Sequence, residues 1–172
     1  SLMKKILNHF FIAGCIFILS CSNNSKISEY SNTFQKIIKN DKGLFRGFLP
    51  GDSLRNIQAS ENGTLLEGDS TYLFYEYKLD SSDTYTLEYQ FENKLLSSVR
   101  ADVYMKDIVQ WKIVFENFRE FFNTKYGNCS RQQDSFVWKI NNGSIHVVLT
   151  DESANFEEGI LSLEIYYAAI LS

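Results

Sequence analysis

Residues 135–150, which read SFVWKINNGSIHVVLT, decide the fold more clearly than any other stretch of the chain. Asn142-Gly143 stands between two strand-like runs, and this dipeptide favours a two-residue type I′ turn. Such a turn pairs Ile140 with Ile145 and Trp138 with Val147. This register places six apolar residues on one face of the hairpin, namely Phe136, Trp138, Ile140, Ile145, Val147 and Leu149. The stretch therefore predicts an antiparallel hairpin with one buried and one solvated face.

Other strand patterns lie on both sides of this hairpin in the sequence. Residues 84–92 alternate strictly between apolar and polar side chains, as in a strand with one wet face. Runs rich in aromatic and β-branched residues predict further strands at 72–79, 94–105 and 160–168. Consecutive strands that short turns connect pair antiparallel.

Helices are predicted at 27–40, 53–60 and 107–126, because apolar residues recur there at helical spacing. Ser53 and Asp107 stand at the N-cap positions of the last two, and Gly127 ends the longest helix.

The order of these elements is helix, three strands, helix, three strands. It predicts an α+β fold in which two helix-plus-three-strand units form an antiparallel sheet with the helices packed on one face. The units are 27–106 and 107–172, within a single domain that spans 27–172.

The beginning of the chain resembles a bacterial lipoprotein signal peptide. Met3 is the expected natural start, with Ser1 and Leu2 as remnants of recombinant expression, and two lysines precede an apolar run to Leu19. That run is shorter than the roughly 20 residues that span a membrane. Ile18-Leu19-Ser20-Cys21 resembles the lipobox, which implies cleavage after residue 20 and lipidation of Cys21, with 21–26 as the lipidated cysteine and tether. Ile12-Ala13-Gly14-Cys15 fits the same pattern, so Cys15 is the alternative.

This interpretation places the domain outside the cytoplasm, lipid-anchored to a bacterial membrane, with the outer membrane and periplasm as the expected location. The net charge of −4 becomes more negative when Lys4 and Lys5 are removed with the signal peptide. A mildly acidic chain argues against nucleic acid as a partner. Expected partners are the membrane, through the lipid, and an envelope protein or polysaccharide.

Residues 48–57, FLPGDSLRNI, and 89–95, YQFENKL, carry a further resemblance. They are similar to patterns in small outer-membrane lipoproteins related to the BamE component of the barrel-assembly machinery, and in the β-lactamase-inhibitory-protein-like fold of two tandem α/β repeats. The resemblance covers 48–105 and implies an envelope-assembly or binding module. A Leu-Gly-x-Pro segment is absent after the helix, where this chain has residues 59–63, ASENG, so the family's contact residues are not carried over.

No catalytic residue, metal ligand or cofactor is predicted. A zinc site needs three or four ligands, and the mature chain has one histidine, His146, and one unlipidated cysteine, Cys129. Loop carboxylates are plentiful, and two that converge in one cleft would suit an envelope hydrolase or carbohydrate-active protein. That remains the alternative to a non-enzymatic protein.

The most informative functional feature is the aromatic content of the strands. Aromatic residues occupy both faces of 72–77, which indicates either a strand covered on both sides or an exposed aromatic patch. Tyrosine suits interfaces because it joins a large apolar ring to a polar hydroxyl. The predicted function is therefore binding or envelope assembly through the sheet face or loops. The candidate binding residues are Tyr72, Tyr75, Tyr77 and Tyr85.

Overall fold

The computed structural model describes residues 26–168, which form eight strands, three α-helices and two short 3-10 helices. The first unit contains η1 (Ile27–Glu29), α1 (Asn32–Ile38), α2 (Leu54–Ser60), β1 (Thr64–Gly68), β2 (Tyr72–Lys78), β3 (Thr84–Glu92) and β4 (Leu95–Met105). The second contains α3 (Ile108–Tyr126), β5 (Ser130–Gln132), β6 (Ser135–Ile140), β7 (Ile145–Asp151), η2 (Ser153–Asn155) and β8 (Gly159–Tyr167). The predicted signal peptide and both candidate lipidation sites lie outside the described residues.

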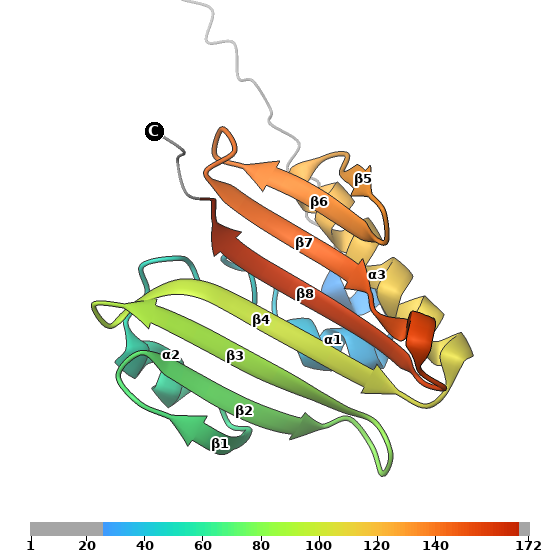
Figure 1. Ribbon diagram of the computed structural model, residues 1–172, viewed down its shortest axis with the longest axis horizontal. Coiled ribbons are helices and arrows are strands. Elements are labelled where there is room, and N and C mark those ends of the chain that lie inside the picture. The colour runs from blue at the N-terminus through green and yellow to red at the C-terminus, as the bar shows by residue number, and fades with distance from the viewer. Residues whose placement is uncertain (1–25, 169–172) are drawn as a thin grey trace, which may run out of the picture.

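All eight strands belong to one antiparallel sheet with the order β1-β2-β3-β4-β8-β7-β6-β5. The two units meet through their last strands, where Val103 of β4 pairs with Leu161 of β8. The strand order of one unit is therefore repeated in reverse by the other. Figure 1 shows the three α-helices behind the sheet, while none of the described α-helices lies on the face turned to the viewer. The predicted α+β fold with helices on one face is confirmed.

Each unit has one strand that the sequence pattern did not predict, and both lie at the sheet edges. All residues of β1 and of β5 are exposed. Neither strand therefore shows the alternation of apolar and polar residues that indicates a half-buried strand. Pairing with the adjacent strand, rather than burial of side chains, defines both edges.

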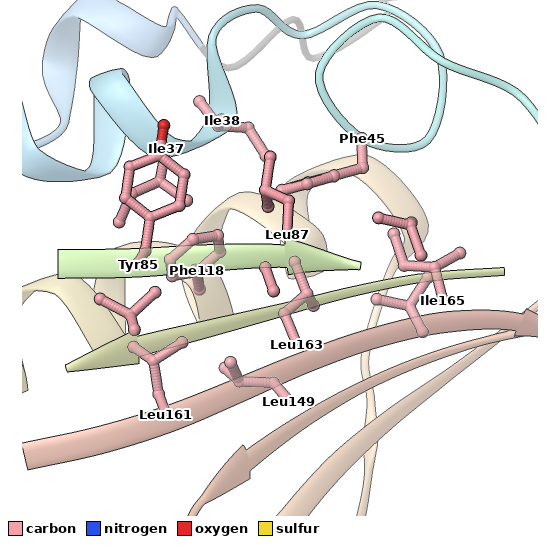
Figure 2. Close-up of a cluster of buried hydrophobic side chains, with 14 of the residues drawn as sticks. Ile37, Ile38, Phe45, Tyr85, Leu87, Phe118, Leu149, Leu161, Leu163 and Ile165 are labelled. Atoms are coloured by element: carbon pink, nitrogen blue, oxygen red, sulfur yellow. The ribbon is translucent and has the colours of Figure 1, made fainter. Parts of the chain in front are cut away.

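The core lies between the sheet and the helices. Phe118 and Phe122 of α3 are fully buried, as are Ile37 and Ile38 of α1. In Figure 2 these α1 residues face Leu87 of the sheet, with Phe118 of α3 beside them. Burial of such apolar side chains is the main force that holds the helices on the sheet.

Helix boundaries follow from local capping. The Asp107 side chain accepts hydrogen bonds from the backbone N–H groups of Val109 and Gln110 at 2.8 and 3.1 Å, as predicted for this N-cap. The predicted helix 27–40 is instead divided into η1 and α1. Ser31 accepts a hydrogen bond from Phe34 N at 3.3 Å and starts a new helix there.

The hairpin register agrees with its turn chemistry. Asn142 and Gly143 both have positive φ, at 57° and 87°, but so does Asn141, at 51°. The connection is therefore four residues long, 141–144, and not the predicted two-residue turn. Ile140 pairs with Ile145 and Trp138 with Val147, as predicted. Among the described residues, no helix is long and apolar enough to cross a membrane.

Candidate functional site

The candidate site is the sheet face that no described helix covers. Because side chains alternate between the two faces of a strand, each strand that buries one set of residues presents the other set here. The pairing registers align these side chains in rows across six strands. One row consists of Tyr72, Gln90, Ser98, Tyr166, His146 and Lys139. The next consists of Phe74, Glu88, Arg100, Glu164, Val148 and Val137. We call this surface the uncovered face.

Charged groups occupy the middle of the uncovered face. Arg100 Nε donates to both carboxylate oxygens of Asp102 at 3.0 Å, and its Nη2 lies 3.4 Å from Glu152 Oε1. The hydrogen bonds to Asp102 raise the pKa of Arg100 above its ordinary value. The guanidinium is therefore held in place on the face instead of moving freely in solvent.

The uncovered face is hollowed over β2 and β3. This acidic hollow has a volume of about 610 Å³. Tyr72 and Phe74 supply aromatic surface, and three carboxylates, Glu67, Glu88 and Glu92, supply charge. A hydrogen bond with Glu67 raises the pKa of Tyr72 to about 12, so its hydroxyl stays protonated at neutral pH. The hollow thus combines aromatic and negatively charged groups, with no lysine or arginine in its lining.

A second hollow lies over β6, β7 and β8 along the same two rows. Its volume is about 560 Å³, and Lys139, His146 and Tyr166 contribute to its lining. His146 Nδ1 lies 3.4 Å from the Tyr166 hydroxyl. Lys139 is opposite His146 in the hairpin, as the predicted register requires. This hollow contains no carboxylate in its lining, so the two halves of the uncovered face differ in charge.

The structure separates the four tyrosines that were predicted as one binding face. Tyr72 lies on the uncovered face, but Tyr75 and Tyr85 are only 3 % exposed beneath the helices. Tyr77 is on the covered side as well, where its ring stacks on Tyr85 with centroids 4.7 Å apart. The grouping of the four is therefore corrected. The strand pattern revealed that aromatics occupy both faces, and only the helix positions show which face is open.

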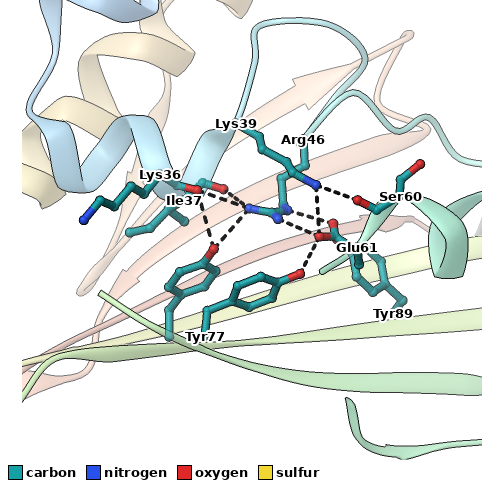
Figure 3. Close-up of polar contacts among 9 residues, drawn as sticks. Lys36, Ile37, Lys39, Arg46, Ser60, Glu61, Tyr77 and Tyr89 are labelled. Carbon is teal, nitrogen blue, oxygen red and sulfur yellow. Dashed lines mark hydrogen bonds and ion pairs between the residues drawn. The ribbon is translucent and has the colours of Figure 1, made fainter. Parts of the chain in front are cut away.

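On the covered side, Tyr77 and Tyr89 contact a buried ion pair that the sequence did not predict. Arg46 Nε and Nη2 donate to the two oxygens of Glu61 at 2.8 and 2.6 Å, a bidentate arrangement (Figure 3). Tyr77 and Tyr89 donate their hydroxyl protons to the same carboxylate at 2.5 and 2.6 Å. Arg46 Nη1 also donates to Ile37 O at 2.6 Å, which connects α1 to the pair.

Burial and pairing act in opposite directions on these groups. Burial alone raises the pKa of Glu61, but the Arg46 guanidinium and the tyrosine hydroxyls outweigh it and lower this pKa to about 2. Burial and the Glu61 charge raise the pKa of Tyr89 well above its ordinary value. The cluster is thus one ionised carboxylate, the Arg46 guanidinium, the Lys39 ammonium 3.3 Å from Glu61 Oε2, and neutral phenols. A site so buried is a structural element of the fold rather than a surface for a partner.

Two of the loop carboxylates, Asp80 and Asp83, and the cysteine Cys129 have local contacts. Asp80 accepts hydrogen bonds from Ser82 N and Asp83 N within its turn, at 2.8 and 2.9 Å. Asp83 accepts one from Lys106 N at 3.0 Å. Cys129 is half-buried and packs against the core. Among residues 26–168, no three histidine, cysteine or carboxylate side chains are arranged to hold a metal ion.

Comparisons with known proteins assign no family to this chain. No protein-family profile matches the chain, and no curated protein does. One solved structure is similar: a DUF4309 family protein, YjgB, from Bacillus subtilis. It is 12 % identical, with a TM-score of 0.43, and the match covers 83 % of this chain and 95 % of that one. The resemblance drawn from residues 48–105 stays a prediction.

Proposed function

We propose that this chain is a membrane-tethered, non-enzymatic binding protein that holds a protein partner of the cell envelope on its uncovered face. The observation that carries the proposal is a six-strand surface without a covering helix among the described elements, hollowed on both halves. A sheet face of an isolated domain needs only solvated polar residues. Here half-buried aromatic rings, Tyr72 and Phe74, lie among them.

The acidic hollow is the proposed centre of the interface. Aromatic residues contribute most strongly to protein interfaces when polar groups around them exclude water. Tyr72 and Phe74 have this setting, surrounded by Glu67, Glu88 and Gln90. The negative charge favours a partner segment with lysine or arginine side chains.

The proposed tether is the lipid on Cys21. Two or more acyl chains hold a protein stably on a bilayer, whereas one chain binds only marginally. The lipoprotein interpretation therefore supports a domain that works close to the membrane surface, where a partner in the envelope is within reach.

Site-specific photo-cross-linking of the full chain in its source bacterium tests the proposal. A photoreactive phenylalanine derivative replaces Thr86, on the uncovered face, or Ile113, which is 41 % exposed on α3. We expect a discrete adduct from position 86 and none from position 113. Equal adducts from both positions, or none from position 86, would contradict the proposed interface.

A second arm tests the aromatic centre. Tyr72→Ala combined with Phe74→Ala should lower the adduct yield roughly tenfold, the effect of losing one interface hot spot. Phe156→Ala is the matched control, because this ring is 59 % exposed and is absent from the acidic hollow. An unchanged yield in the double variant would exclude the hollow as the centre of the interface.

A further inference from the structure

The sheet ends at β1 in an edge that pairs with no further strand among the described residues. β1 pairs with β2 on one side only, and Figure 1 shows it at the margin of the sheet. An edge strand presents a row of unpaired backbone N–H and C=O groups on its outer side. An extended peptide can add to such a row as a further strand.

The two edges of the sheet differ in how well they are protected. Natural proteins protect edges with short strands, with lysine or proline residues, and with bulges. At one edge β5 has only three residues, and its middle residue, Arg131, lies over the Phe136 ring. At the other edge β1 has five residues, Thr64–Gly68, without a lysine, arginine or proline. Its one protective feature is a bulge at Leu66, where the register with β2 shifts. The β1 edge is therefore the more open of the two.

Apolar side chains are exposed along β1. Leu65 is 44 % exposed and Leu66 is 51 % exposed. A Cβ atom at Gly68 would stand 2.9 Å from Leu73 Cδ2 and 3.5 Å from Leu65 Cδ1. Leu65 therefore continues the apolar helix side of the sheet, where Leu73 is buried, out to the edge. A strand added beside β1 would remove this apolar surface from water, which is favourable.

On the uncovered face the same edge is acidic. Glu67 is exposed and lines the acidic hollow together with Glu88 and Glu92. Glu67 lies opposite Phe74 in β2, whereas Leu65 lies opposite Tyr75, so these two β1 side chains belong to opposite faces. The bulge at position 66 causes this, because without it residues two apart would share a face. A strand beside β1 therefore meets carboxylates on one face and leucine on the other.

We propose that β1 accepts an extended segment of the protein partner in which lysine or arginine alternates with apolar residues. Strand side chains point alternately to the two faces of a sheet. Every second residue of the segment thus lies beside the carboxylates, and the others lie beside the leucines. Backbone pairing supplies affinity, and the alternation supplies specificity. The inference rests on the proposed function, because it names the part of the partner that the acidic hollow holds.

Charge argues against a second copy of this chain as the occupant. Antiparallel pairing of β1 with β1 of another copy would place two acidic hollows side by side. Like charges brought together at an interface oppose association. A basic segment instead lowers the repulsion among the carboxylates of the hollow.

Nuclear magnetic resonance of the backbone amides tests the inference on the full chain labelled with ¹⁵N. The probe is a peptide of seven residues, the length of β2, in which lysine alternates with valine. We expect saturable shifts of the β1 amide signals and slower hydrogen exchange at β1, because strand pairing occupies its free N–H groups. The amide signals of β5 serve as the internal control and should stay in place.

A peptide of the same composition, with its lysines and valines in two separate blocks, is the matched control. It has the same charge but does not present lysine on one face and valine on the other. We expect it to bind roughly tenfold more weakly than the alternating peptide.

Three outcomes of these titrations would overturn the inference. Equal binding of the two peptides, or equal shifts at β1 and β5, would show unspecific attraction of basic peptides to an acidic chain. Signals of β1 that move with protein concentration alone would show pairing between copies of this chain.

Glu67→Lys tests the charge on the protein side. Because the side chain is exposed, the variant should keep the fold. It should bind the lysine–valine peptide roughly tenfold more weakly, and bind a glutamate–valine peptide more tightly than the wild type does. Glu120→Lys makes the same change of charge at an exposed position of α3 and should leave both affinities unchanged. Equal effects of the two variants would overturn the placement of the basic residues beside Glu67.

The peptide titration and the cross-linking experiment can fail independently. An adduct from position 86 without peptide binding at β1 would overturn strand pairing and keep the proposed interface. Peptide binding at β1 without an adduct from position 86 would overturn the interface on the uncovered face and keep the edge as a site for basic strands.

Discussion

Arg46 and Glu61 illustrate how single residues constrain this fold. Both side chains are almost completely buried, at 1 % and 0 % exposure. A buried ion pair gains little net stability over an apolar pair, because desolvation offsets the attraction between the charges. Breaking it is costly, because the remaining charge stays in a medium of low dielectric constant. The pair therefore requires α1, the segment that carries Arg46, and β2 and β3 to be in place together.

Glu61→Gln should lower the free energy of unfolding by about 3–5 kcal/mol, since it leaves the Arg46 charge buried without a counter-ion. Chemical denaturation followed by circular dichroism measures the change. Glu76→Gln is the control, because Glu76 is half-buried on the uncovered face and should change stability by about 0.5 kcal/mol or less. Equal losses in the two variants would contradict the role given to the buried pair.

The Glu61 carboxylate should also make the stability of the folded chain sensitive to acid. The pKa of Glu61 falls from its ordinary value of 4.5 to about 2 in the folded chain. Its ionisation therefore contributes stability that is fully present above pH 4.5 and is lost as the pH falls towards 2, an effect of about 3 kcal/mol. Unfolding free energies measured across this window should decline for the wild type and decline less for Glu61→Gln. Parallel profiles would show that other groups carry the pH dependence.

At the scale of elements, the pairing of edge strands and the contacts of helices with the sheet shape this fold more than the helix and strand propensities of its residues do. The pairing register of β6 with β7 was predictable, because an Asn-Gly turn signal and a two-sided pattern reinforce each other, although the connection itself is four residues long instead of two. The edge strands β1 and β5 had neither signal. The contact of α3 with β8 likewise has no signal in the sequence. It nevertheless requires a glycine at position 159.

Gly159→Ala tests that contact. The added Cβ would stand 2.2 Å from Trp111 Cγ, so α3 or the ring must move. We expect a loss of about 1–3 kcal/mol in the free energy of unfolding, as for other overpacked cores. In the background of Trp111→Ala the same substitution should cost clearly less, and the double-mutant cycle measures this coupling. Additive losses would mean that the two residues do not compete for space.

At the scale of the whole molecule, two similar units share one sheet and one core. They join where β4 pairs with β8, so the centre of the sheet is also the boundary between the units. The three α-helices of residues 26–168 lie on one side (Figure 1), so none of them covers the opposite side of the sheet. The lipid anchor proposed at Cys21 would restrict this surface to the vicinity of a membrane.

The anchor can be tested by metabolic labelling with palmitate. Wild type and Cys15→Ser should both incorporate label, whereas Cys21→Ser should incorporate none, because lipidation requires the thiol of the cysteine at the cleavage site. Labelling that persists in Cys21→Ser and disappears in Cys15→Ser would assign the anchor to the alternative cysteine. Absence of label in the wild type would exclude the lipoprotein interpretation.

The sequence by itself determined six of the eight strands, the pairing register of β6 with β7 and the capping residues Ser53 and Asp107, because these depend on contacts between near neighbours in the chain. It also revealed aromatics on both faces of β2. Only the tertiary structure decided that Tyr75, Tyr77 and Tyr85 turn inwards while Tyr72 faces outwards, and that Arg46 meets Glu61. The physical reason is that both faces of an aromatic strand have similar hydrophobicity, so the side on which distant helices pack determines which rings are buried.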